Sequence, residues 1–505
     1  MLATLRSATL VGIDGRPVRV EVHVSTGLPA YHVVGLPDAS GRESRERVRA
    51  ALLSSDLPWP MQRITVNLAP GGLRKTGAGF ELAVAIGLLV AGEALPYSVV
   101  TDLGVLGELG LDGSVRRVPG VLALVDALRR AGVRRVIVPL ANAAEAALVD
   151  DVEICPARTL AELRACLEGE ADWPAIPALP PPSPDRGDGA DSEEPLDLAD
   201  VRGLPTARLA LAASAAGGHH LLLVGPPGTG KTMLARRLPT ILPELTREAA
   251  LEVTRIHSVA GHAPTHTLAS TPPFRAPHHT ASTAALVGGG SGRPSPGEVT
   301  LAHHGILFLD ELGEFAPSTL DALRQPLEDG VVRIARQGMT LAFPARFVLV
   351  ACTNPCPCGL GARACRCDRA QRSRYGRRLS APLLDRFDLR LPVEPSELGE
   401  PPGVASAVTR EQVMVAVERQ RARLCGTSWS HNARIPAGAL ERFVPLSAAA
   451  AEAWLLLSGA RELTGRGSAR IRRVARTLAD LDDRDEITAT DLATAGVLRA
   501  DITVS

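Results

Sequence analysis

Lysine is nearly absent from this chain of 505 residues, in which Lys75 and Lys231 are the only two among 55 lysine and arginine residues. Arginine supplies the other positive charges, so a lysine indicates a site that needs a compact ammonium group rather than a wide guanidinium fork. Lys231 is therefore the first candidate for a specific binding role.

Net charge and long apolar runs are also missing. The 55 basic residues balance 55 acidic ones, so any contact with nucleic acid must use local basic patches. The most apolar stretch, residues 82–92, is about eleven residues long and too short to cross a bilayer. Residues 1–6 lack the apolar core typical of a signal peptide. We therefore expect a cytoplasmic protein with no membrane partner.

Lys231 ends a glycine-rich run that matches the phosphate-binding loop G-x-x-x-x-G-K-[ST] at every position. Residues 220–224 predict a buried strand before the run, and residues 233–238 predict a helix after it. Backbone amides of such a loop hold the β-phosphate, the lysine reaches the β- and γ-oxygens, and the following hydroxyl ligates Mg²⁺. We predict that ATP and Mg²⁺ bind at Gly225, Pro226, Pro227, Gly228, Thr229, Gly230, Lys231 and Thr232.

Three further blocks follow in the order of a P-loop ATPase. An apolar strand ends in Asp310 and Glu311, which would hold Mg²⁺ through water and polarise the attacking water, respectively. A second apolar strand stops at Asn354, whose amide suits a sensor that contacts the γ-phosphate. Arg386 lies between carboxylates at a predicted helix end. It is either a surface ion pair or an arginine finger that reaches a neighbouring subunit's nucleotide.

Composition divides the chain into three domains and a linker, in line with a prior of ~150 residues per domain. Residues 171–196 are rich in proline and acidic residues and predict a disordered linker. We expect an N-terminal domain over 1–170, an α/β ATPase core over 197–395 and a helical lid over 396–505. Apolar residues at helical spacing over 470–481 support the last of these.

The order of these motifs resembles an AAA+ ATPase, and four longer segments, 217–223, 274–280, 296–303 and 354–359, are similar to the magnesium-chelatase-like YifB/ComM family. The similarity covers nearly the whole chain. It implies a homo-hexamer that binds single-stranded or branched DNA and acts as a branch-migration helicase in recombination or competence.

The resemblance also implies further site residues. A sensor-2 arginine is expected at the start of a lid helix, where Arg466 aligns best and Arg470 and Arg473 are rivals. Two substrate-facing hairpins are expected, within 275–296 and 331–341. Residues 336–338 of the second suit a hairpin turn. The candidate contacts to DNA phosphates on this hairpin are Arg333 and Arg336.

Five of the eight cysteines fall between residues 352 and 367, which excludes a disulfide framework. Two C-x-C pairs, Cys356 with Cys358 and Cys365 with Cys367, could together hold one tetrahedral Zn²⁺. Reduced surface thiols and a redox-sensitive pair are the alternatives.

The N-terminal residues 34–142 look similar to the Lon-protease-like α+β domain of the ribosomal-S5 type. Lon enzymes use a serine activated by a lysine. Those two positions hold Gly79 and Leu122 in this chain, so we expect no proteolysis. Lys75, in a glycine-rich loop, is a candidate phosphate contact.

Two functions other than a DNA motor fit parts of the sequence. One is a chelatase motor subunit that drives metal insertion into a tetrapyrrole, and the N-terminal domain argues against it. The other is an ATP-dependent protease, which the missing Ser–Lys dyad disfavours.

Overall fold

A computed structural model describes residues 1–73, 75, 78–177, 196–261, 267–290, 294–336, 339–360, 365–395, 399–460 and 464–500. Residues 178–195 of the predicted linker lie outside this described part. The chain forms two compact units, the first built from its N-terminal part with residues 250–269 and the second from the remainder. No described helix is long and apolar enough to cross a membrane.

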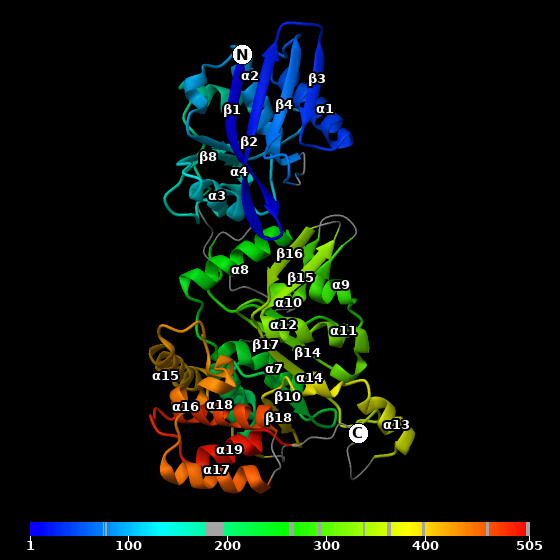
Figure 1. The fold of residues 1–505 in the computed structure, drawn as a ribbon, viewed down its shortest axis with the longest axis vertical. Coiled ribbons are helices and arrows are strands. Elements are labelled where there is room, and N and C mark those ends of the chain that lie inside the picture. Colours follow the sequence, from blue (N-terminus) through cyan, green and yellow to red (C-terminus); the bar gives the residue numbers. More distant parts are fainter. Residues whose placement is uncertain are drawn as a thin grey trace. The chain divides into compact units, whose positions relative to one another are not determined.

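The first unit is built on a seven-stranded mixed sheet with the order β3-β4-β2-β1-β5-β8-β9 (Figure 1). Valines at every second position of β2 are buried, as expected for a strand with one face toward a core. The most apolar stretch of the sequence forms the buried helix α2. The strands are β1 (Leu2–Val11), β2 (Asp14–Ser25), β3 (Ala30–Val34), β4 (Arg63–Ala69), β5 (Leu103–Val105), β8 (Arg135–Pro139) and β9 (Glu153–Ala157).

Helices complete this unit. They are α1 (Asp38–Ser54), α2 (Glu81–Ala91), α3 (Val121–Arg130), α4 (Leu140–Ala146) and α5 (Leu160–Glu168), with most of α8 (Arg247–Ala260). A short hairpin of β6 (Glu108–Leu109) and β7 (Val115–Arg116) stands apart from the sheet. Leu122 is buried in α3 and Gly79 lies in the turn before α2, so neither position can supply the side chain of a Ser–Lys dyad.

The second unit is built on a five-stranded parallel sheet with the order β11-β14-β17-β10-β18. Its strands β10 and β14 are wholly apolar and buried, as is typical of parallel strands covered on both faces. Helices α6 (Pro205–Gly217) and α7 (Lys231–Arg237) flank β10. The strands are β11 (Phe274–Arg275), β14 (Ile306–Leu309), β17 (Val348–Thr353), β10 (Leu221–Val224) and β18 (Leu389–Pro392).

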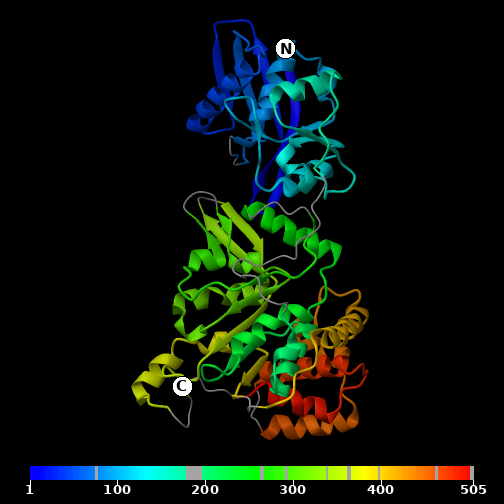
Figure 2. The ribbon, with the colours of Figure 1, turned by 180° about the vertical axis from the view of Figure 1, so that it is seen from behind.

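The predicted α/β class and the C-terminal helical region are confirmed. Four longer helices, α15 (Ser406–Leu424), α17 (Ala448–Ala460), α18 (Gly465–Leu481) and α19 (Ala489–Leu498), gather beside β10 and β18 (Figures 1 and 2). The predicted helical periodicity over 470–481 is the buried face of α18. Its Ile471, Val474 and Leu478 belong to the same hydrophobic cluster as Leu221 and Leu223 of β10.

A buried polar network joins the C-terminal helices to the start of β10. The His219 Nε2 atom lies 2.8 Å from the Thr477 hydroxyl, and the Asn432 amide donates to both Thr477 and Asp480. Asp480 also accepts from Arg423 and forms an ion pair with Arg476. Buried polar groups are tolerated only when partnered in this way, so the network fixes how α18 meets the sheet.

Both predicted hairpins are confirmed. The second pairs β15 (Val331–Arg336) with β16 (Met339–Pro344), and residues 337–338 of its turn lie outside the described residues. The first contains β12 (Gly288–Gly289) and β13 (Ser295–Pro296). A Cβ on Gly288 would lie 3.4 Å from the Ile334 side chain, so the two hairpins pack against each other.

The side chain of His220 should make the stability of the fold sensitive to acid. Its Nδ1 accepts the amide of Leu349 at 3.0 Å, and burial lowers its pKa from 6.5 to about 4 despite the nearby Asp388. Because the unfolded chain then binds the proton more tightly, stability is full above pH 6.5 and falls as pH drops toward 4, by about 1.4 kcal/mol for each pKa unit.

We expect His220→Asn, which keeps an acceptor for Leu349, to lose less unfolding free energy than the parental protein between pH 6.5 and 4. Urea unfolding at a series of pH values measures this, with the exposed His23→Asn as control. If the free energy of unfolding changes with pH in the same way in the parental protein and in His220→Asn, His220 is not the source of the acid sensitivity.

Candidate active site

The predicted phosphate-binding loop connects β10 to α7 and is tightly constrained. Gly228 and Gly230 have φ angles of 78° and 83°, a left-handed region that favours glycine. A Cβ on Gly225 would lie 2.2 Å from the Val393 carbonyl oxygen. The glycine pattern therefore has a steric reason at three positions.

Lys231 lies inside this loop, with only 8% of its surface exposed. Its ammonium group donates to the carbonyl oxygens of Gly225 and Pro226, both at 2.7 Å. Burial lowers the pKa of Lys231, while Cys352 and Asp310 act in the opposite direction. An ammonium has three N–H donors, so among the described contacts one remains for a phosphate oxygen.

The predicted Mg²⁺ ligands are in direct contact. The Thr232 hydroxyl, in the first turn of α7, donates to Asp310 Oδ2 at 2.8 Å, and Asp310 follows β14. A hydroxyl and a carboxylate that converge beside a phosphate loop are an oxygen donor set suited to Mg²⁺. The residues present therefore fit ATP with Mg²⁺.

Glu311 has a φ angle of 49°, which is uncommon outside glycine. Such strained residues cluster at active sites. Its Oε2 lies 3.5 Å from His279 Nδ1, and the His279 ring packs edge-on against Phe315. No local sequence pattern pairs His279 with Glu311. The only signal was its place in the segment 274–280.

Asn354 completes this group. It directly follows β17, and the preceding Thr353 carbonyl accepts the amide of Gly225 at 3.2 Å. The sheet register brings Val224 level with Thr353 and Leu309 level with Ala351. The phosphate loop, Asp310, Glu311 and Asn354 therefore lie together at the carboxyl edge of the parallel sheet.

Arg386 lies at the opposite edge. It precedes β18, and the amide of the nearby Asp388 donates to the carbonyl of His220, just before β10. The Arg386 side chain is 12% exposed and forms an ion pair with Glu328. It lines a cavity of about 420 Å³ to which no residue of the phosphate loop contributes. The arginines that line this cavity are Arg386, Arg434, Arg466, Arg470 and Arg473.

The three sensor-2 candidates differ in exposure and partners. Arg470 is 10% exposed and pairs with Asp385 at 3.0 Å and with Asp388 at 3.1 Å. Arg473 is half-buried, and desolvation lowers its pKa. Arg466 is 72% exposed and 3.9 Å from Asp385. Arg466 thus has the side chain most able to reach a group outside its own chain.

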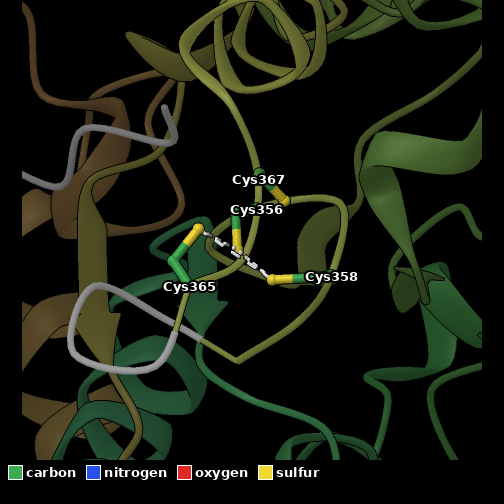
Figure 3. A group of neighbouring side chains, drawn as sticks. All are labelled: Cys356, Cys358, Cys365 and Cys367. Atoms are coloured by element: carbon green, nitrogen blue, oxygen red, sulfur yellow. Dashed lines mark hydrogen bonds between the residues drawn. The ribbon is translucent and has the colours of Figure 1, made fainter.

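The four predicted zinc-ligand cysteines converge at one point (Figure 3). The sulfur atoms of Cys356, Cys358 and Cys365 are 3.4, 3.6 and 3.9 Å apart, and all four sulfurs lie within 4.8 Å of one another. Backbone amides of Leu360 and Arg366 lower the pKa of Cys358 to about 6, which favours its thiolate.

The remaining candidate phosphate contacts are Arg333, Arg336 and Lys75. Arg333 is 51% exposed on β15 and donates to Asp329 at 2.6 Å. The Arg336 side chain lies outside the described part of the structure. Lys75 is buried and donates to the Pro70 carbonyl of its own loop, and burial lowers its pKa.

Three protein-family models match successive parts of the chain. "Magnesium chelatase, subunit ChlI" matches residues 197–400, "Subunit ChlI of Mg-chelatase" matches 20–142, and "Magnesium chelatase, subunit ChlI C-terminal" matches 403–499. A shorter similarity, 26% identity over 134 residues, links the chain to the archaeal Lon protease of Methanocaldococcus jannaschii. It covers 26% of this chain and 20% of that protein.

Whole-length relatives agree with these models. YifB of Escherichia coli is 41% identical over 508 residues, and the competence protein ComM of Haemophilus influenzae is 40% identical over 508 residues. Each alignment covers 99% of this chain and 97% of the relative. A protein of Mycobacterium tuberculosis is 44% identical over 494 residues, 96% of each chain.

Two substitutions separate nucleotide binding from hydrolysis. We expect Lys231→Ala to abolish ATP binding, because the phosphate charge loses its counter-charge inside the loop. Glu311→Gln should bind ATP with little change but hydrolyse it about 10²- to 10⁴-fold more slowly, since the proton acceptor is lost. Fluorescent-nucleotide titration and phosphate release measure the two effects.

The exposed Glu418→Gln, on α15, is the matched control and should behave as the parental protein. Parental rates of hydrolysis in Glu311→Gln would remove Glu311 from the reaction.

Proposed function

The chain belongs to the YifB/ComM family of magnesium-chelatase-like AAA+ proteins, and on this premise we propose that it is an ATP-hydrolysing, homo-hexameric helicase that remodels branched DNA in recombination or transformation. The main support is that the phosphate loop, Asp310, Glu311 and Asn354 lie at one edge of the sheet, while the arginines around Arg386 lie at the opposite edge. Each subunit would then hold half of two different active sites.

ATP hydrolysis follows from the carboxyl-edge group. Lys231 and the loop amides would bind the phosphates, while Thr232 and Asp310 would hold Mg²⁺. When bound, Mg²⁺ offsets the charge of the β- and γ-phosphates. Glu311 would accept the proton of the attacking water, and Asn354 would orient that water against the γ-phosphate. His279, beside Glu311, is placed to orient the carboxylate.

The position of Arg386 favours action on a neighbouring subunit. Strand β10 has four residues and spans about 13 Å, with the phosphate loop after it and the Arg386 edge before it. An arginine at the amino edge therefore faces away from its own γ-phosphate. Arg466, the exposed arginine in the same cavity, would act beside Arg386 as sensor 2. A closed ring supplies this arrangement at every interface.

DNA contact is assigned to the paired hairpins. The two hairpins pack against each other through Gly288 and Ile334, and Arg333 is exposed on β15. Because net charge is zero, binding must depend on such local cations. The name of the Haemophilus relative refers to competence, which supports DNA as the substrate.

The first unit would serve as a scaffold or DNA-handling module rather than a protease. Its similarity to an archaeal Lon protease supports the shared fold, and Gly79 and Leu122 occupy the two dyad positions. The Lys75 ammonium donates to the Pro70 carbonyl of its own loop, which leaves two N–H donors among the described contacts, so Lys75 stays a candidate phosphate contact.

A chelatase motor subunit is the second candidate function, favoured by the family descriptions and by 26% identity over 208 residues to the tobacco chloroplastic ChlI. That alignment covers 39% of this chain and 42% of the tobacco protein. ATPase assays with and without four-way DNA discriminate between the two, since a chelatase motor has no reason to respond to branched DNA.

We also infer that the four cysteines hold a structural Zn²⁺. Thiolates about 2.3 Å from a tetrahedral Zn²⁺ lie about 3.8 Å apart. The sulfur separations of 3.4, 3.6 and 3.9 Å bracket this value.

Arg386 should act in trans. We expect Arg386→Ala and Lys231→Ala each to lose ATPase activity, and their mixture to recover part of it, because some interfaces then combine an intact loop with an intact finger. Arg410→Ala, which removes an exposed arginine paired with Glu244, is the control and should remain active alone. If mixed rings form but recover nothing at any ratio, Arg386 acts within its own chain.

Arg333 and Arg336 should contact backbone phosphates without reading bases. Replacing either with alanine should lower the slope of log affinity against log salt by about one unit, with no change of sequence preference. Arg164→Ala is a matched control, because Arg164 also forms an exposed ion pair with a residue four positions away. An unchanged slope together with full stimulation of the ATPase by DNA would remove these residues from the DNA path.

A further inference from the structure

We propose that a metal ion bound by Cys356, Cys358, Cys365 and Cys367 sets the position of Asn354 against the phosphate loop, so that metal occupancy controls the rate of ATP hydrolysis rather than ATP binding. The inference rests on the ATPase function and the zinc site proposed above. It assigns the cysteine cluster a positioning role inside the reaction cycle.

The first cysteine pair is continuous with the sensor strand. Cys356 is two residues from Asn354, and only Pro355 separates them. The turn that follows is closed by a 3.0 Å bond from the Gly359 amide to the Cys356 carbonyl. A Cβ on Gly359 would lie 2.8 Å from the Pro227 ring of the phosphate loop and 4.0 Å from the Asn354 amide carbon. The turn that contains Cys356, Cys358 and Gly359 therefore packs against both the phosphate loop and Asn354, which surround the γ-phosphate position.

The second cysteine pair is continuous with a helix that holds the catalytic turn. Cys367 leads into α13 (Arg369–Gly376), whose Tyr375 is buried. The Tyr375 hydroxyl lies 3.1 Å from the Thr353 hydroxyl, beside Asn354. It also lies 2.4 Å from where a Cβ on Gly313 would stand, two residues after Glu311. Arg378 donates to the Gly313 carbonyl at 2.8 Å.

The four sulfurs therefore lie where two segments meet, and we call these segments the arms. The first is the turn with Cys356 and Cys358, and the second runs from Cys365 and Cys367 into α13. One arm carries Asn354 and touches Pro227, and the other bears on the turn after Glu311. A bound metal joins the arms by bonds far stiffer than the packing of a short loop. Without it, the register of β14 and β17 still holds the two strand ends level, but Asn354 and the turn after Glu311 lose the bonds that fix their fine positions. Misplacement of a catalytic group by about 1 Å can cost about 10²-fold in rate.

Nucleotide binding should be less sensitive to the metal. Lys231 and Thr232 are held by α7, by the loop carbonyls and by Asp310, all of which lie outside the cysteine arms. Loss of metal should therefore lower kcat by about 10- to 100-fold, while the Kd for ATP changes by less than about threefold.

The test uses the full chain and the double variant Cys365→Ser/Cys367→Ser, because these ligands are the farther pair from Asn354 in sequence. Zinc content is measured by atomic emission, ATP binding with a fluorescent analogue, and hydrolysis by phosphate release. The control is Cys425→Ser, which removes an exposed thiol outside the cluster and should keep zinc and rate. We expect one zinc per parental chain, none in the double variant, retained ATP binding and the fall in kcat.

Coupling through Asn354 gives a second readout. If the metal acts by positioning this residue, adding Asn354→Ala to the double variant should lower kcat little further, since both changes remove the same interaction. If the fold-reductions in kcat from the two changes multiply in full, the metal does not act through Asn354. Stripping zinc from the parental protein with a chelator and restoring it with Zn²⁺ alone tests the same point without a mutation that disturbs folding.

Equal rates in zinc-loaded and zinc-stripped protein would overturn the inference, as would four freely titratable thiols and no zinc in the parental chain. Loss of ATP binding in step with hydrolysis would also overturn it, because the metal would then support the whole loop. Failure of the proposed ATPase function looks different: the zinc-loaded parental protein would bind ATP and not hydrolyse it.

Discussion

The parallel register of β14, β17, β10 and β18 is the constraint on which both halves of the proposed mechanism depend. Because these strands run in one direction and end level, every residue that follows a strand meets the others at one edge. Thr232 contacts Asp310 there, although 78 positions separate them in the chain. The same register sends Arg386, which precedes a strand, to the other edge. One backbone feature thus gathers the groups proposed to bind and cleave ATP and keeps the proposed finger away from them.

The sequence predicted best what a short segment decides by itself. The loop at Lys231, the apolar strand before Asp310, the hairpin over 331–341 and the helix over 470–481 are local patterns, and each is present in the structure. The convergence of the four cysteines could also be anticipated, because two C-x-C pairs separated by six residues can fold back on each other.

Contacts between distant segments could not be predicted in this way. His279 meets Glu311, and Tyr375 reaches Thr353 and the turn at Gly313, through packing that no local pattern encodes. The lid arginines show the same limit. The family resemblance favours Arg466 but leaves Arg470 and Arg473 as rivals. The contacts with Asp385 and Asp388, which come from the segment before β18, distinguish Arg470 from Arg466.

Asp388 also connects the sheet edge that holds Arg386 to the C-terminal helices. Its carboxylate pairs with Arg470 of α18 and lies 3.6 Å from His219, whose ring reaches Thr477 on the same helix. The buried network around Asp480 continues this link into α15, so the lid and the sheet share one packed core. Electrostatic stabilisation of a transition state is effective when the donor is held in place before the reaction. A finger and a sensor mounted on this core would keep their spacing while a neighbouring nucleotide is hydrolysed. That rigidity is what a ring needs if the chemistry at one interface is to move whole subunits rather than single side chains.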